Sequence, residues 1–132
     1  MKRDMDLIRA LLLKLEAIGS SHKVMAFTAD DEEIAIEGYD EEQIAYHLML
    51  LNEAGLIDSG GVRSGRFASG EFSFRRLTWN GHEFLDSVRD PEVWRMTKAG
   101  AAKVGGWTFG LIKDLATAVI KETVKEKTGL SL

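Results

Sequence analysis

The feature that most constrains the fold of this chain is the stretch 39–57, which encodes a helix with a marked start and a marked end. Asp40 has the chemistry of an N-cap, and Gln43 stands three residues later, where it completes a capping box. Gly55 suits the left-handed position that follows the last turn of a helix. We therefore predict a helix over about 41–54 that stops abruptly and leads into an extended segment.

An amphipathic helix is predicted to precede this one, over about 4–18. Its apolar residues recur at helical spacing and share one face: Ile8, Leu11, Leu12, Leu15 and Ile18. Two short extended segments follow at 24–27 and 34–36, and consecutive acidic residues separate them at 30–33. We predict that the two segments pair as a small hairpin with an acidic tip.

Residues 56–77 have the pattern of two strands joined by a glycine-rich loop. A helix over about 79–89 should follow, with Trp79, Leu85 and Val88 as core candidates.

The last part of the chain reads as two more helices. Asp90 and Pro91 are typical of an N-cap and a first helical residue, so a helix should run from there through about Val104. The pair Gly105-Gly106 breaks the pattern, and a final amphipathic helix is predicted over about 107–127.

Together these elements predict a mainly α fold with a small antiparallel sheet (α+β). We expect one domain over residues 1–104 and a C-terminal helical segment over 105–132, which packs on the domain or mediates dimerisation. The core should combine leucines from several elements: Leu11, Leu12, Leu15, Leu48, Leu51, Leu56, Leu77 and Leu85.

The distribution of charge limits the classes of function. The 132 residues carry a net charge of −4, and residues 24–56 contain nine acidic residues and no Lys or Arg. Nucleic-acid-binding domains are usually basic, so this distribution argues against DNA contact by the capped helix. No uninterrupted apolar stretch approaches the ~20 residues that span a bilayer. We expect a cytoplasmic protein without a membrane span.

The sequence contains no recognisable catalytic or metal-binding motif. It has no cysteine, and His22, His47 and His82 are too far apart to form a known ligand pattern. His82-Glu83 begins like the zinc motif HExxH, but Asp86 occupies the place of the second histidine. We expect no enzyme, no metal, no cofactor and no small-molecule substrate. For His47 we expect a hydrogen-bonded structural role.

Two strings carry a resemblance to known proteins: HLMLLNEAGLI at 47–57 and LTWNGHEFLD at 77–86. With the glycine-bearing loop between them, they resemble the second half of winged-helix regulators, in which the first string is a recognition helix that runs into the wing. The whole chain, including its MKRDMDLIR start and its late GGWTF, also resembles a small family of bacterial and prophage proteins known as domain of unknown function 2513. The resemblance implies a winged-helix-like domain with its wing at about 56–77, and a binding role without a mechanism.

Two features depart from a standard DNA-binding winged helix. The segment before the capped helix reads as strands, and the presumed recognition helix has no Arg or Lys, the residues that make the commonest base contacts. Gln43 and Asn52 have the chemistry to read adenine, whereas Glu41 and Glu42 would repel phosphates.

Two hypotheses therefore follow, and we favour the first narrowly. In the first, the protein binds double-stranded DNA: wing arginines and an N-terminal arm meet phosphates, and the helix touches bases. The candidate residues are Lys2, Arg3, Gln43, Tyr46, Arg63, Arg66, Arg75 and Arg76. The simpler interpretation is that the arginines keep the hairpin soluble. In the second hypothesis the same fold is a protein-interaction module, such as a phage-encoded modulator of a host complex, whose acidic face meets a basic partner.

Aromatic residues near the Gly105-Gly106 break, together with the apolar stripe of the last helix, form a candidate dimer or partner surface. Its residues are Trp94, Trp107, Phe109, Ile112, Leu115 and Val119. Such residues most often fill the joint between two helices, so core packing is the default interpretation. We nevertheless expect a homodimer, because aromatic anchors favour a contact between copies.

Overall fold

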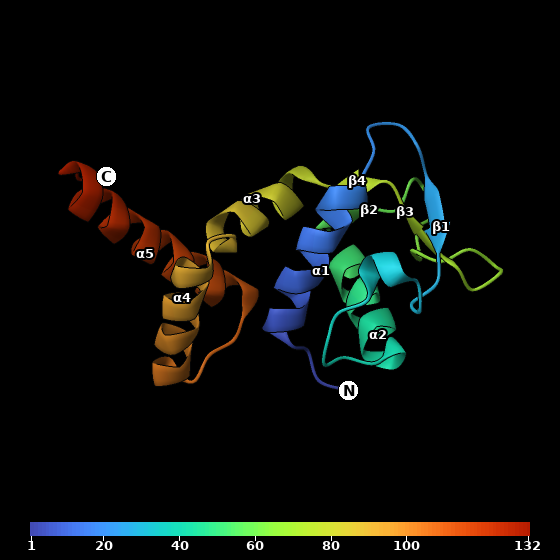
Figure 1. Ribbon diagram of the computed structural model, residues 1–132, viewed down its shortest axis with the longest axis horizontal. Helices are drawn as coiled ribbons and strands as arrows, with labels where there is room; N and C mark the ends of the chain where they lie inside the picture. Colours follow the sequence, from blue (N-terminus) through green and yellow to red (C-terminus); the bar gives the residue numbers. More distant parts are fainter. The chain divides into compact units, whose positions relative to one another are not determined.

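A computed structural model describes all residues, 1–132, as a mostly helical α+β fold with five α-helices and two small antiparallel sheets (Figure 1). The predicted fold class is confirmed. The chain divides into two compact units, Met1–His82 and Glu83–Leu132, whereas the sequence suggested a division between residues 104 and 105. None of the helices is long and apolar enough to cross a membrane.

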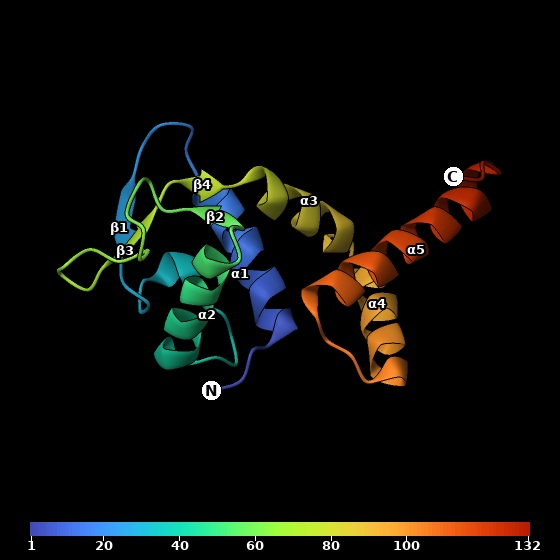
Figure 2. The ribbon, with the colours of Figure 1, turned by 180° about the vertical axis from the view of Figure 1, so that it is seen from behind.

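Helix α1, Met5–Ile18, is capped by Asp4, whose side chain accepts hydrogen bonds from the backbone N–H groups of Asp6 and Leu7. Four residues of the predicted apolar face are buried, Ile8, Leu11, Leu12 and Leu15, whereas Ile18 is only half-buried. Met5 and Leu7 are buried as well. Helix α1 packs against α2 (Glu41–Glu53), η1 (Glu32–Ile34) and β4 (Arg76–Leu77). The front and back views both show α1 beside α2 (Figure 1 and Figure 2). Helix α1 therefore forms the centre of the first unit.

The expected hairpin between 24–27 and 34–36 was wrong. Strand β1, Met25–Phe27, is present, but the acidic segment after it turns into the short 3-10 helix η1, in which Ile34 is fully buried. The turn is closed by two hydrogen bonds, from Thr28 N–H to the Asp31 carboxylate and from Asp31 N–H to the Thr28 carbonyl. Because the side chain of Asp31 satisfies the backbone locally, the segment does not need a strand partner.

Helix α2 has the two ends that the sequence predicted. The capping box between Asp40 and Gln43 is complete. At the other end Gly55 is left-handed with φ 71°, Leu56 N–H donates to the Leu51 carbonyl over 3.0 Å, and Gly55 N–H donates to the Asn52 carbonyl. These bonds are a Schellman ending, which turns the chain directly into β2 (Ile57–Asp58).

The strands form two antiparallel pairs. β1 pairs with β3, Phe72–Phe74, in the register Met25↔Phe74 and Phe27↔Phe72, and β2 pairs with β4 in the register Ile57↔Leu77. The rings of Phe27 and Phe72 stack with their centroids 6.2 Å apart, so aromatic burial selects β3 as the partner of β1. The predicted core leucines are all buried, although Leu85 belongs to the second unit.

The remaining helices are α3 (Trp79–Val88), α4 (Pro91–Val104) and α5 (Phe109–Thr128). Asp90 and Thr108 cap α4 and α5, and Gly105 ends α4 in the left-handed conformation. Helix α4 packs against α5, and the Phe84 and Phe109 rings stack at 4.6 Å.

The expectation that Trp79 is a core residue was wrong, because its side chain is 80% exposed. Phe84, Leu85 and Val88 are buried instead, at the spacing of one helix face. Gly81 lies on that buried face, and Trp79, two residues earlier, is rotated from it by about 200° around the helix, so Trp79 faces outward.

Candidate binding surface on the first unit

The loop between β2 and β3, residues 59–71, lies within the segment 56–77 that was expected to act as a wing, and it is tied to α2 and β3 at its base. Asn52 of α2 donates from Nδ2 to the Arg63 carbonyl over 3.1 Å. Ser73 N–H donates to the Gly65 carbonyl over 2.9 Å, and the Ser73 hydroxyl donates to the Ser59 carbonyl over 2.7 Å. We call residues 59–71 the β2–β3 loop.

Two of the four candidate arginines of this region are committed to an ion pair. Arg75 donates to Asp58 Oδ2 from Nη2 at 2.5 Å and from Nε at 3.1 Å, and Arg76 Nε lies 3.7 Å from the same oxygen. The Arg75 hydrogen bond, followed by the N–H of Gly60, holds the pKa of Asp58 below its ordinary value. The two ion pairs therefore connect Arg75, just before β4, and Arg76, at the start of β4, to Asp58 at the end of β2.

The other two arginines lie in the loop itself and are exposed. The Arg66 guanidinium stands 4.3 Å from the centroid of the Phe72 ring, in a cation–π contact that orients it on the strand. The Arg63 side chain has no such contact. Arg76 is exposed as well, with 53% of its side-chain surface accessible, but only Arg63 and Arg66 of the four are exposed without an ion pair to Asp58.

The candidate residues of the N-terminal arm, Lys2 and Arg3, lie at the opposite end of α2 from the β2–β3 loop. Lys2 and Arg3 are exposed, and the following residue, Asp4, is bonded to Tyr39, just before α2, and to His47, in the middle of α2. The β2–β3 loop instead adjoins the last turn of α2 through Asn52. Helix α2 thus separates the two predicted basic groups rather than bringing them together.

The two amide side chains that were expected to read bases are already engaged. Gln43 Oε1 accepts the Asp40 N–H at 3.0 Å, and Asn52 holds the β2–β3 loop. Reading adenine requires both the carbonyl and the amino group of an amide, so neither side chain is available in this structure. Tyr46 is half-buried, and its ring lies edge-on to His47 with the centroids 5.5 Å apart.

The outward stripe of α2 is acidic at its ends and apolar in the middle. Glu42 and Glu53 are exposed, Met49 is 39% exposed, and Tyr46 is half-buried. The spacing of these residues by four, three and four positions places them on one helix face. We call Glu42, Tyr46, Met49 and Glu53 the α2 stripe.

His47 has the structural role that the sequence predicted. The residue is only 1% exposed, its Nε2 accepts the Asp4 N–H at 2.8 Å, and its Nδ1 donates to the Gln43 carbonyl at 2.7 Å. The Asp4 carboxylate also accepts the Tyr39 hydroxyl at 2.8 Å. Burial, and then this hydrogen bond, raise the pKa of Tyr39 to about 12.

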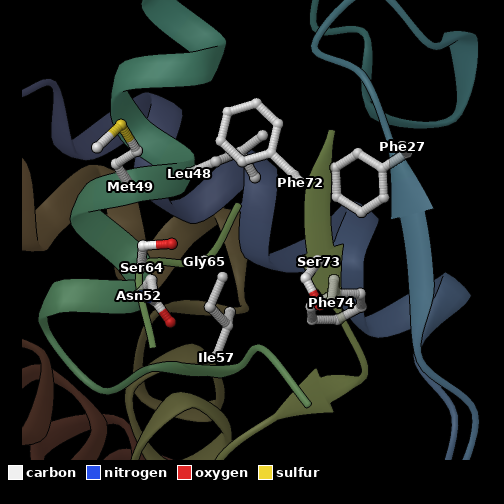
Figure 3. A pocket seen from close by; sticks show the side chains of 10 residues that line it. All are labelled: Phe27, Leu48, Met49, Asn52, Ile57, Ser64, Gly65, Phe72, Ser73 and Phe74. Carbon is white, nitrogen blue, oxygen red and sulfur yellow. The ribbon is translucent and has the colours of Figure 1, made fainter. Parts of the chain in front are cut away.

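A hollow of about 10 Å³ lies between α2, the β2–β3 loop and the strands (Figure 3). Met49 and Asn52 from α2, Gly65 from the loop and Phe72 from β3 are among the residues that line it. Ligand pockets usually measure at least ~300 Å³, and a space of this size holds one water molecule at most. The hollow is therefore a packing detail beneath the α2 stripe rather than a ligand site.

The candidate dimer surface is largely used inside the second unit. Trp94 is 4% exposed and Ile112 is fully buried, and Phe109 stacks on Phe84. Leu115 lies against Gly100 of α4: a Cβ placed on that glycine would be in van der Waals contact with Leu115 Cδ2, at 3.5 Å. Val119 is half-buried, and Trp107 keeps 42% of its surface exposed. The structure thus places most of this stripe between α4 and α5.

The fold and these surfaces define a small, mostly helical protein whose candidate contacts are exposed side chains. The chain matches the family described as "Hypothetical protein (DUF2513)" over residues 2–107, and it belongs to that family. It is also 37% identical over 123 residues to an "Uncharacterized protein" of Haemophilus influenzae, which covers 92% of this chain and 98% of that protein. No solved structure matches the chain.

Proposed function

We propose that the first unit is a winged-helix-like module that binds another macromolecule and catalyses no reaction. The order of elements supports this assignment: α1, β1, a short helical turn, α2, β2, a loop and a return strand. Strand β1 pairs with the return strand, and η1 stands where a helix-turn-helix has its short first helix. The segment expected to form two strands thus has one strand, β1, followed by η1, which supports the winged-helix-like assignment.

The target that the geometry supports best is a protein. The observation that carries this choice is the α2 stripe, whose exposed charged groups are both acidic and whose centre is apolar. A helix that docks in the major groove needs cations or free amides at its surface, and α2 has neither. Aromatic residues and Met are enriched at protein interfaces, which matches Tyr46 and Met49.

Site-specific photo-crosslinking tests this proposal directly. A photoreactive amino acid at Met49 should yield a defined protein adduct in the cells from which the chain comes. The same probe at Ala17, an exposed residue on α1, is the matched control within the first unit. Identical adducts from both positions, or none from Met49, would contradict protein binding by the α2 stripe.

A second candidate function is duplex DNA binding through the β2–β3 loop, and the exposure of Arg63 and Arg66 favours it. Such binding would act through phosphates, so it should be weak and should decrease steeply as salt is raised. The double variant Arg63→Ala, Arg66→Ala should reduce it. A low-salt titration that shows no duplex binding by the unmodified protein would remove this candidate.

A further inference from the structure

We infer that the partner of the α2 stripe is a basic protein segment with apolar anchor residues, an inference that rests on the protein-binding function proposed above. The charge around the stripe is the first observation. Residues 24–56 contain nine acidic residues and no Lys or Arg. Eight of the nine are exposed in the structure, and only Asp31 is half-buried; the exposed ones are Asp30, Glu32, Glu33, Glu37, Asp40, Glu41, Glu42 and Glu53.

These carboxylates are not neutralised by neighbours in the first unit. Salt bridges in this unit involve other carboxylates: Asp58 pairs with Arg75 and Arg76, and Glu16 pairs with His82. Both lie outside residues 24–56. An uncompensated acidic surface raises the local concentration of cationic partners and repels anionic ones. A basic partner therefore gains attraction there, and the phosphates of duplex DNA are disfavoured.

The apolar centre of the stripe is the second observation. Tyr46 and Met49 lie between Glu42 and Glu53, eleven residues apart along the helix, which corresponds to about 16 Å. A partner helix of about eleven residues, or an extended segment of about five, matches that length. The Met49 side chain is flexible, so it can adapt its shape to an apolar anchor. The α2 stripe has a carboxylate at each end and an apolar centre, so it favours a partner segment in which cationic residues flank an apolar side chain.

Nuclear magnetic resonance titration with two synthetic probes tests this inference. The first probe is an amphipathic peptide of Leu and Lys, and the second is its Leu and Glu counterpart of equal length. The Lys peptide should shift the backbone amides of the α2 stripe more than those of α5, and the shifts should weaken with added salt. The Glu peptide should leave the stripe unchanged.

Charge variants provide the matched control. Glu42→Lys with Glu53→Lys should weaken Lys-peptide binding about tenfold, since each reversal replaces an attraction with a repulsion. Glu122→Lys with Glu126→Lys changes the net charge equally on exposed residues of α5 and should have little effect. The milder pair Glu42→Gln with Glu53→Gln removes the same two charges without placing a cation at the start of α2, and it should weaken Lys-peptide binding by a smaller factor.

The outcomes separate this inference from the proposed function. Equal binding of the two peptides, or equal losses from the α2 and α5 variants, would overturn the basic partner. If the Met49 adduct persists in the Glu42→Lys, Glu53→Lys protein, the stripe still binds a protein, but not through its charge. If duplex DNA instead shifts the stripe amides and Met49 yields no adduct, both the inference and protein binding by this face are wrong.

Discussion

His47 Nε2 accepts a hydrogen bond from the backbone N–H of Asp4 at 2.8 Å, across 43 positions of sequence. Because Nε2 accepts this N–H, the ring proton is on Nδ1, which donates to the Gln43 carbonyl, and both nitrogens are satisfied in a buried site. The same Asp4 caps α1 with its carboxylate. One imidazole therefore connects the first turn of α1 to the middle of α2.

Replacing His47 should be costly to stability. His47→Ala leaves the Asp4 N–H without its acceptor, removes the side-chain bond to the Gln43 carbonyl and opens a cavity, so we expect a loss of about 2–4 kcal/mol in the free energy of unfolding. Chemical denaturation measures it. His22→Ala, at an exposed histidine, is the control and should change the stability by less than ~0.5 kcal/mol. Equal losses would show that the buried bonds of His47 contribute nothing.

The alkaline limit of stability should depend on Tyr39. Its pKa is raised from 10.0 to about 12 in the folded protein, first by burial and then by the Asp4 carboxylate. The unfolded chain loses this proton first, so the contribution is complete below pH 10 and is lost as the pH rises from 10 towards 12. Tyr39→Phe should flatten this decline. Absorbance titration of the tyrosinate, with Tyr46→Phe to isolate Tyr39, measures the shift directly.

The acid limit should depend on Asp58. Its pKa is lowered by the hydrogen bond from Arg75, so its contribution is present above the ordinary value of 3.8 and is lost as the pH falls through the lowered folded value. Asp58→Asn should cost about 1–2 kcal/mol at neutral pH, because a charged hydrogen bond is removed at a partly exposed site. The difference between the two proteins should shrink in acid. A constant difference from neutral pH to pH 3 would contradict this role.

Two helical glycines should respond in opposite directions to the same substitution. A Cβ at Gly81 would lie 2.0 Å from the Leu56 carbonyl oxygen, so Gly81→Ala must push α3 away from the chain that enters β2. We expect a loss above ~2 kcal/mol, although alanine by itself favours a helix by up to ~1 kcal/mol. At Gly110 a Cβ meets nothing within 4 Å, so Gly110→Ala should leave stability unchanged or raise it. Thermal unfolding of both variants compares them.

Helix α5 should stabilise the second unit rather than act as a free appendage. Its Ile112 and Ala116 are fully buried, and α4 packs against it. A chain that ends at Gly105 exposes the apolar side of α4, and we expect it to lose stability and to associate. Light scattering and denaturation of the full and shortened chains measure both effects. If both chains are monomeric and equally stable, α5 is not part of the core.

The candidate surface could be predicted only in part. The sequence predicted a glycine-rich loop between two strands, which the structure has between β2 and β3, and it predicted a hydrogen-bonded structural role for His47. It did not reveal that Arg75 and Arg76 meet Asp58, or that Gln43 and Asn52 are occupied by backbone groups. Whether a polar side chain is available depends on its neighbours in space, and those neighbours lie up to 18 positions away in this case.

Features with local causes could be predicted from the sequence. The capping box and the Schellman ending of α2, and the Asp90-Pro91 start of α4, each involve hydrogen bonds or backbone angles within about six residues, so the residues present define them. Tertiary structure alone decided that β1 pairs with β3, that the acidic segment coils into η1, and that Trp79 faces outward. In each of these cases several local conformations were compatible with the sequence. The choice among them came from the burial of distant side chains, such as Phe27 against Phe72, which no short window of sequence contains.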